Sequence, residues 1–220
     1  MSFTHAEENY LKAIYHLSSP EAATVSTNAV AEALRTKPAS VTDMLRKLAA
    51  KGLLDYVKYQ GASLTDDGRR VALLVIRKHR LWETFLVEKL RFQWDQVHEV
   101  AEQLEHIHSP LLIRRLEAFL DYPEVDPHGD PIPNEGGAIV SRPRRPLAEA
   151  EAGRDLKVVG VEETSPLFLR YLDKVGVAIG TRLRVLEQIP FDRSLELLID
   201  GQRTQLVSRE VSENIYVTGG

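Results

Sequence analysis

Histidines and carboxylates are concentrated in one short segment of the chain, HEVAEQLEH at residues 98–106. Because residues three or four positions apart share a helix face, the pattern predicts that Glu102, Glu105 and His106 converge, with His98 one turn earlier. Carboxylate oxygen and imidazole nitrogen, without sulfur, suit Mn²⁺ or Fe²⁺, while Zn²⁺, Co²⁺ and Ni²⁺ can also bind such ligands. The alternative interpretation is an acidic helix face exposed to solvent.

A second pair of this kind precedes the segment. His79 and Glu83 are four residues apart in a long apolar pattern, so they share a face of the expected helix. Two helices joined by a short connection pack antiparallel, which allows this pair to meet the residues of the 98–106 segment. A cation placed among like-charged carboxylates turns their repulsion into binding energy. The two stripes together predict a metal centre.

A different chemistry is indicated by residues 36–47, which carry small, hydroxyl and basic side chains. Small residues allow a helix to approach the major groove closely, hydroxyl groups can donate to phosphates or base edges, and basic side chains neutralise phosphates. An ordinary amphipathic helix with a solvated basic side is the alternative. The candidate DNA-binding residues, one of them in the hairpin that follows, are Thr36, Lys37, Ala39, Ser40, Thr42, Asp43, Arg46, Lys47 and Lys58.

The elements around this segment follow the order of a winged helix-turn-helix. Thr4 and Glu7 form a capping box for a first helix that ends at Ser18-Ser19-Pro20. A second helix begins near residue 27, and a third begins at Pro38 and stops at Gly52. Strands are expected at 53–59 and 62–64. A long helix capped by Thr65 follows, and then two further helices at 96–108 and 111–120.

The C-terminal part changes from a helical to a strand pattern. A Pro/Gly-rich stretch follows residue 120, and residues 142–155 are expected to form a linker. Strands at 158–161, 182–189 and 195–199, a short helix at 167–172 and the turn Asp200-Gly201 predict a small β-barrel. The expected fold class is mainly α with a C-terminal all-β domain. The expected domains are 1–70 for DNA binding, 71–141 for metal binding and dimerisation, and 156–220 for the barrel.

Composition excludes several classes of protein. The 220 residues contain no cysteine, which excludes disulfides, thiolate metal sites and cysteine nucleophiles. No apolar run approaches the ~20 residues that cross a bilayer, and the N-terminus lacks a secretory signal pattern, so we expect a cytoplasmic protein with no membrane partner. Residues 35–80 carry eleven Lys/Arg against four Asp/Glu, whereas residues 81–135 carry four against twelve. This asymmetry suits a chain that binds a polyanion with one part and cations with another.

The chain resembles the DtxR/MntR family of metal-dependent repressors. The motifs that carry the resemblance occur in one order: EENYLKAIYHL, KPASVT, KYQGASLTDDGRR, RKHRLWETFL, HEVAEQLEHIHS and DPHGDPIP. The final domain is similar to the FeoA-like domain of the longer members. The resemblance implies a homodimer that binds a palindromic operator in double-stranded DNA, and no enzyme activity.

The resemblance also implies a role for individual residues. His79, Glu83 and His98 match one metal site of the family, while Glu102, Glu105 and His106 match the core of a second site. Glu102 stands where iron-sensing members have Cys and manganese-sensing members have Glu. At the first helix, Asn9 replaces the Met or Asp of the two branches, and Lys12 stands where manganese-sensing members have a further carboxylate.

Two further positions are compared with the family in the same way. Glu163 and Leu167 lie near the positions of a Glu and a Gln that third domains of DtxR-like members donate to a metal. Leu167 cannot ligate, and whether Glu163 or Glu8 ligates stays open.

We therefore expect a repressor of metal-homeostasis genes that responds to Mn²⁺ first and Fe²⁺ second, with Zn²⁺ or Co²⁺ binding in vitro. We expect dimerisation through residues 71–120, using the apolar row Leu81, Trp82, Phe85, Leu86 and Leu90. The alternatives are a winged-helix regulator that senses an organic ligand, and a metal-dependent hydrolase. The hydrolase is disfavoured because the chain lacks a Gly-rich substrate loop and because a basic helix-turn-helix would have no role.

Overall fold

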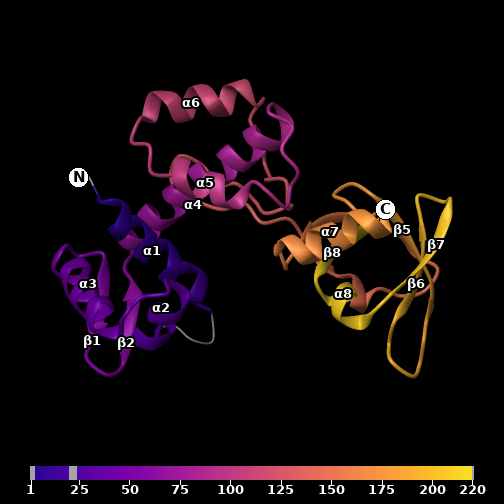
Figure 1. Ribbon diagram of the computed structural model, residues 1–220, viewed down its shortest axis with the longest axis horizontal. Coiled ribbons are helices and arrows are strands. Elements are labelled where there is room, and N and C mark those ends of the chain that lie inside the picture. Colours follow the sequence, from indigo (N-terminus) through magenta and orange to yellow (C-terminus); the bar gives the residue numbers. More distant parts are fainter. Residues whose placement is uncertain (1–2, 20–23, 220) are drawn as a thin grey trace. The chain divides into compact units, whose positions relative to one another are not determined.

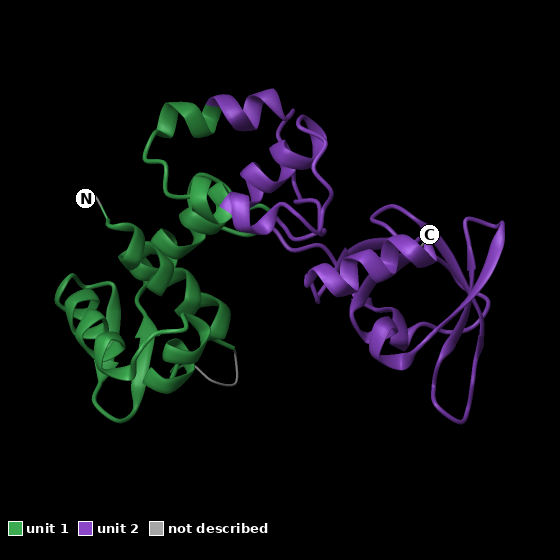
Figure 2. Cartoon of the chain, in the orientation of Figure 1, with its two compact units in different colours: residues 1–79, 102–114, 132–139 green, residues 80–101, 115–131, 140–220 purple. Residues whose placement is uncertain are grey.

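A computed structural model describes residues 3–19 and 24–219 of the chain. By contacts the chain divides into two compact units (Figure 2). The first contains residues 1–79, 102–114 and 132–139, and the second contains residues 80–101, 115–131 and 140–220. Pro20, part of the expected end of the first helix, lies outside the described residues.

The winged helix belongs to the first unit. It consists of α1 (His5–Leu17), α2 (Thr27–Ala33), α3 (Pro38–Ala50), β1 (Leu54–Val57) and β2 (Gly61–Leu64) (Figure 1). The capping box of Thr4 and Glu7 is present, and Pro38 occupies the first turn of α3, as the sequence predicts. The fully buried residues of its core, 0% exposed, are Leu11, Ile14, Val30, Val41, Leu45, Leu48 and Ala62.

The hairpin leads directly into the long helix α4 (Asp66–Glu88). Thr65 caps it, because its hydroxyl accepts the backbone N–H of Gly68 at 3.1 Å. Gly68 is required here for close packing, since a Cβ at this position would lie 1.9 Å from the carbonyl oxygen of Leu53. The helix is therefore anchored against the winged helix at its first turn.

Of the two helices after α4, the first is shorter than expected and the second is shifted by one residue. The first, α5, spans only His98–Leu104, and α6 spans Pro110–Phe119. The prediction of a helix over 96–108 is wrong at both ends. The backbone N–H of Ile107 donates to Leu104 at 3.1 Å, an i to i+3 turn that ends the helix. Glu105 and His106 therefore lie in a turn, and not on a helix face.

The apolar row proposed for dimerisation is largely used inside the chain. Leu81, Trp82 and Leu86 are buried, at 0%, 9% and 3% exposure, so the prediction that they exceed the needs of the core is wrong. Leu90 is exposed and Phe85 half-buried. Exposed apolar side chains lie instead on α6, namely Leu111, Leu112 and Phe119. Among the described residues, no helix combines the length and the apolar character needed to cross a membrane.

The C-terminal part of the second unit is an antiparallel sheet of six strands in the order β3-β8-β4-β5-β6-β7. Its elements are β3 (Arg145–Pro146), a 3₁₀ turn (Leu147–Glu149), β4 (Asp155–Val161), α7 (Pro166–Val175), β5 (Arg182–Gln188), β6 (Leu195–Ile199), β7 (Arg203–Val207), α8 (Arg209–Glu213) and β8 (Ile215–Gly219). The mainly α fold class with a C-terminal β domain is thus confirmed. Residues 145–149, expected in the linker, belong to the sheet domain, because Arg145 and Pro146 pair with β8 and Leu147 is fully buried.

Candidate metal centre and DNA-binding surface

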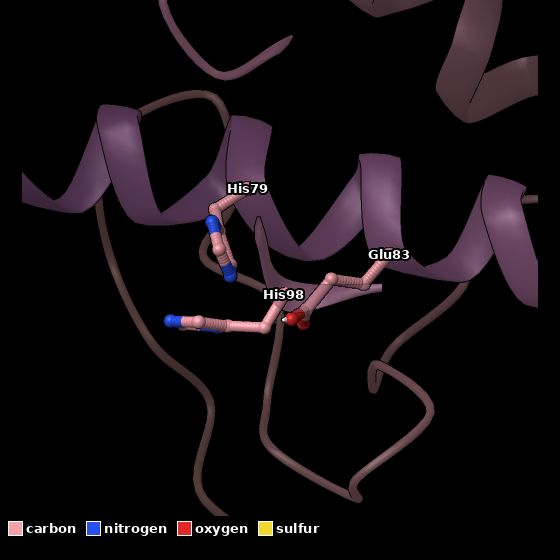
Figure 3. A group of neighbouring side chains, drawn as sticks. All are labelled: His79, Glu83 and His98. Carbon is pink, nitrogen blue, oxygen red and sulfur yellow. Dashed lines mark ion pairs between the residues drawn. The ribbon is translucent and has the colours of Figure 1, made fainter. Parts of the chain in front are cut away.

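Glu83 lies at the centre of one cluster of metal-ligand types, the Glu83 cluster. His79 and Glu83 are one turn apart on α4, and His98 begins α5; Figure 3 shows the three side chains together. Each offers a ligand atom, and these atoms all lie within 4.8 Å of one another. His98 Nδ1 is 3.5 Å from Glu83 Oε1. His79 and Glu83 are buried, whereas His98 is exposed.

The same carboxylate faces a second group, which completes the Glu83 cluster. Glu83, Asp126 and His128 are all buried and also offer ligand atoms within 4.8 Å of one another. His128 Nδ1 is 3.7 Å from Glu83 Oε2. Sequence analysis missed Asp126 and His128 as site residues, although the motif DPHGDPIP contains both. Their pairing with α4 depends on a loop whose path the sequence pattern does not predict.

Hydrogen bonds and an ion pair fix the position of Asp126 in its loop. Asp126 Oδ1 accepts the backbone N–H groups of His128 and Asp130 at 2.8 and 3.0 Å, and its Oδ2 lies 3.3 Å from Arg80 Nε. Burial alone would lower the pKa of His128, but Glu83 and Asp126 raise it to about 9. Burial and the nearby charge of Glu83 raise the pKa of Asp126 to about 6. In this arrangement an imidazolium at His128 partly neutralises the carboxylates around it.

A second cluster, the Glu105 cluster, lies within the first unit and contains Glu8, Lys12, Glu102, Glu105 and His106. The side chain of Glu105 is 0% exposed. Lys12 Nζ donates to Glu105 Oε1 and Oε2 at 2.6 and 2.9 Å, and His79 Nδ1 lies 2.6 Å from Oε2. Burial would raise the pKa of Glu105, but His79 and Lys12 lower it. Glu105 is therefore a buried, ionised carboxylate.

The other members of the Glu105 cluster come from α1 and from the turn after α5. His106 Nδ1 lies 2.6 Å from Glu8 Oε2, and Lys78 Nζ donates to Glu8 Oε1 at 3.3 Å. Glu102, half-exposed, lies 3.7 Å from Lys12 Nζ. Asn9 follows Glu8 on α1 and is half-buried. The structure thus brings Glu8 into the cluster, a residue whose role the sequence leaves open.

The C-terminal candidates behave differently. Glu163 is exposed, and its carboxylate accepts the backbone N–H of Ser165 at 2.6 Å, which is the N-cap residue of α7. Leu167 is 79% exposed. Glu163 therefore supports the start of a helix, and neither residue belongs to the Glu83 cluster as the described residues define it.

The DNA-binding candidates lie in the two residues before α3, on one exposed face of α3 and in the hairpin. Val41, Leu45 and Leu48 fill the opposite, fully buried face. The Thr42 hydroxyl donates to the Pro38 carbonyl at 3.0 Å, so it presents acceptor lone pairs to a ligand. Thr36 and Thr42 are half-buried. The other candidates are exposed, namely Lys37, Ala39, Ser40, Asp43, Arg46, Lys47 and Lys58.

Some of these cations already have partners. Lys47 and Lys51 lie 3.1 and 2.5 Å from the carboxylate of Glu7, which is 0% exposed. Burial alone would raise the pKa of Glu7, but hydrogen bonds from Lys51 and the Thr4 backbone, together with Lys47, lower it to about 2. Arg46 pairs with Asp43 at 3.6 Å. In the hairpin, Lys58 lies over the ring of Tyr59, which is 92% exposed.

Tyr59 was missed by sequence analysis, although an aromatic residue beside a lysine at a hairpin tip is a visible signal. The ammonium of Lys58 can neutralise a phosphate, and the exposed side chain of Tyr59 beside it can contact the sugar-phosphate backbone. The hairpin therefore offers two side chains, and not one, as candidates for DNA contact.

Three family models match successive parts of the chain. Residues 2–62 match the N-terminal DNA-binding domain of iron-dependent repressors, and residues 65–134 match the metal-binding and dimerisation domain of the same proteins. Residues 145–219 match the FeoA domain.

Relatives over the whole length agree with these models. The iron-dependent repressor IdeR of Mycobacterium tuberculosis is 36% identical over 223 residues, covering 96% of this chain and 95% of the relative. The diphtheria toxin repressor of Corynebacterium glutamicum is 30% identical over 191 residues, covering 82% and 83%. A manganese-dependent transcriptional repressor in complex with manganese has a TM-score of 0.83 at 36% identity, covering 97% of this chain and all of the solved one.

These matches cover the winged helix, the helices with both clusters and the C-terminal sheet. They describe DNA-binding repressors and not enzymes, and they include a domain for dimerisation. The chain belongs to the DtxR/MntR family of metal-dependent, DNA-binding transcriptional repressors.

Proposed function

We propose that the chain is a homodimeric repressor activated by Mn²⁺, with Fe²⁺ as the second candidate, that binds a palindromic operator of metal-homeostasis genes in the cytoplasm. Residues 1–70 bind DNA in this proposal, and residues 71–141 bind metal and form the dimer. The observation that carries it is the convergence of α1, α4 and the turn after α5 on the buried carboxylate of Glu105.

The donor chemistry fits a divalent cation. We assign Glu102, Glu105 and His106 of the Glu105 cluster as ligands, together with Asn9, which follows Glu8 on α1. Oxygen and imidazole donors without sulfur suit Mn²⁺ and Fe²⁺, whereas a thiolate would favour softer ions. In the Glu83 cluster we assign His79, Glu83 and His98 as ligands, with Asp126 and His128 as the residues that position Glu83. His79 belongs to the Glu83 cluster and also lies 2.6 Å from Glu105 Oε2. These two groups of ligand types support a site for more than one cation per subunit.

The choice of Mn²⁺ rests on Glu102 and on similarity. Glu102 supplies a hard oxygen donor, which suits Mn²⁺ better than it suits the softer ions. A solved relative with a TM-score of 0.83 is titled a manganese-dependent repressor in complex with manganese. Fe²⁺ remains the second candidate, because the relative from Mycobacterium tuberculosis, equally identical at 36%, is named an iron-dependent repressor. Zn²⁺ or Co²⁺ is expected to bind the same donors in vitro.

The position of α1 connects metal and DNA in this proposal. A bound divalent cation supplies the positive charge that offsets repulsion among the carboxylates of the Glu105 cluster. Glu8 and Asn9 lie on α1, which packs against α2 and α3. Fixing α1 to the turn after α5 therefore fixes the recognition helix against the dimerisation domain. A ~100-fold tighter affinity of metal for this arrangement supplies about 2.7 kcal/mol, enough to shift a two-state equilibrium strongly.

Two symmetric recognition helices would read two half-sites of a palindrome. In this proposal Ala39 and Ser40 lie towards base edges in the first turns of α3. The lysines 37 and 58, with Arg46, neutralise phosphates. Lys47 Nζ lies 3.1 Å from Glu7 Oε1, and its other N–H groups can donate to a phosphate.

Equilibrium dialysis of the full chain against Mn²⁺, and against Fe²⁺ without oxygen, tests the proposal. We expect both ions to bind, Mn²⁺ at the concentration that also induces binding to operator DNA. The comparison with Glu105→Gln, which removes one charge without changing shape, identifies the site. A chain that bound neither ion would instead favour a regulator that senses an organic ligand. Binding that was equally tight after this substitution would show that the metal does not bind in the Glu105 cluster.

A further inference from the structure

Lys12 holds an unusual position in the Glu105 cluster, because both oxygens of one carboxylate accept from its ammonium. The distances are 2.6 and 2.9 Å, and the side chains are 15% and 0% exposed. The same ammonium lies 3.7 Å from Glu102 Oε1. A single cationic group therefore bridges two of the carboxylates that the proposed function assigns to a metal.

A fully buried carboxylate requires a compensating charge, and Lys12 supplies part of it without any metal. His79 Nδ1 occupies the other side of Glu105 Oε2, at 2.6 Å. With two donors already present, Glu105 has few lone pairs left for a further partner. A cation that binds both Glu105 and Glu102 must displace the ammonium, since two positive charges cannot share this position.

We infer that Lys12 is a tethered competitor of the metal, which occupies the cation position in the metal-free protein and sets how much metal is needed to activate the repressor. This inference rests on the proposed function. It makes Lys12 a residue that tunes affinity and does not ligate. It also gives Lys12 a second effect, because its ion pair joins α1 to the turn after α5 when metal is absent.

The two effects have opposite signs in a variant without the charge. Removing the ammonium leaves Glu105 short of a counter-charge, so the metal-free protein becomes less stable to heat. The same change removes the competitor, so Mn²⁺ binds at least about tenfold more tightly. The interaction energy of a unit charge at hydrogen-bond distance in a partly buried site is larger than the free energy of a tenfold change in affinity. A purely structural role for Lys12 would lower stability without raising metal affinity.

The test is a Mn²⁺ titration of the full chain, with free Mn²⁺ followed by its electron paramagnetic resonance signal, and melting curves without metal. Lys12→Met removes the charge, and Lys12→Gln removes it while retaining a donor for Glu105, in case the first variant folds poorly. Lys12→Arg retains the charge. Lys51→Met is the matched control, because Lys51 also pairs across elements with a fully buried carboxylate of α1, that of Glu7.

We expect Lys12→Met and Lys12→Gln to gain at least about tenfold in Mn²⁺ affinity while melting at a lower temperature without metal. Lys12→Arg and Lys51→Met should bind Mn²⁺ within about twofold of the parent chain, since neither removes charge from this cluster. Unchanged or weaker Mn²⁺ binding in both uncharged variants, with binding still lost in Glu105→Gln, would overturn the competitor role alone. Binding unaffected by Glu105→Gln would overturn the proposed site and the inference with it.

Discussion

The carboxylate of Glu8 and the imidazole of His106 lie 2.6 Å apart, although 98 positions separate them in the chain. The ring of His5 stacks on the same imidazole, with centroids 4.5 Å apart. The first turn of α1 is therefore tied to the turn after α5 even without metal. This contact, like the ion pair of Lys12 with Glu105, connects the Glu105 cluster to the winged helix, because Glu8 and Lys12 both lie on α1, which packs against α3.

Replacing His106 by Ala should abolish metal-dependent operator binding and leave a folded dimer. The imidazole is a proposed ligand and also the partner of Glu8, so both the cation and α1 lose a contact. Fluorescence anisotropy of labelled operator, with and without Mn²⁺, measures the loss. His108→Ala is the control, because His108 is more exposed and lies 3.8 Å from the same carboxylate. A His106→Ala protein with the parent metal response would contradict the assignment.

His79→Ala should weaken the metal response more than a substitution that affects the Glu83 cluster alone. His79 is within reach of Glu83 and also lies 2.6 Å from Glu105, so the variant perturbs both clusters. Calorimetric titration with Mn²⁺ should show every binding phase weakened. His128→Ala should instead weaken one phase by at least about tenfold. Identical titration curves for the two variants would argue against two separate clusters.

Glu102→Cys should move the metal preference from Mn²⁺ towards Zn²⁺ and Co²⁺. A thiolate is a softer donor than a carboxylate, so it binds Zn²⁺ and Co²⁺ more tightly than it binds Mn²⁺. Competition between Mn²⁺ and Co²⁺ for the variant, read from the absorption of cobalt–thiolate, provides the measurement. Glu102→Gln controls for loss of charge alone. The proposal for Glu102 as a ligand would be wrong if the ratio of affinities were unchanged.

Lys37→Ala and Lys58→Ala should each weaken binding to all DNA sequences alike and flatten the dependence on log salt by about one unit. Lys47→Ala should behave differently, because its ammonium lies 3.1 Å from buried Glu7. We expect this variant to lose stability as well, by about 1 kcal/mol. Salt titrations and urea unfolding of the three proteins separate the two effects. Equal stability of all three would show that the Glu7 pair does not hold α3.

Phe119→Glu should shift the chain from dimer towards monomer. Phe119 is 62% exposed on α6, the helix that also carries exposed Leu111 and Leu112, in the part of the chain that matches a dimerisation domain. Burying a carboxylate in an apolar interface is unfavourable without a partner. Phe191→Glu is the matched control, since Phe191 is 98% exposed in the connection between β5 and β6. Light scattering at micromolar concentration that gave equal masses for both variants would exclude this face.

The sequence predicts helix starts and turns well where nearby residues make the backbone hydrogen bonds. The capping box at Thr4 and Pro38 in the first turn of α3 depend on neighbouring residues. The turn at Asp200-Gly201 is also closed locally, by the backbone N–H of Gln202 donating to Ile199 at 3.0 Å. Tertiary contacts decided the rest. The end of α5 is set by a turn that carries Glu105 into contact with α1 and α4, and no periodicity in the sequence encodes that contact.

The candidate site was predicted in its residue types more than in its arrangement. His79, Glu83 and His98 do lie together, but on α4 and the first residue of α5. Asp126 and His128 were missed because their loop has no periodic pattern, and its position depends on Arg80 and on backbone hydrogen bonds. The role of Lys12 was invisible for the same reason, since 93 residues separate it from Glu105.

Operator binding measured with Mn²⁺, with Fe²⁺ under nitrogen, with Zn²⁺ and with a chelator tests the central claim most directly. The full chain and Glu105→Gln should be titrated side by side onto a palindromic operator. We predict tight binding of the full chain with Mn²⁺, at least about 100-fold weaker binding with the chelator, and no response to metal in the variant. Binding of equal strength with and without metal in the full chain would contradict the account.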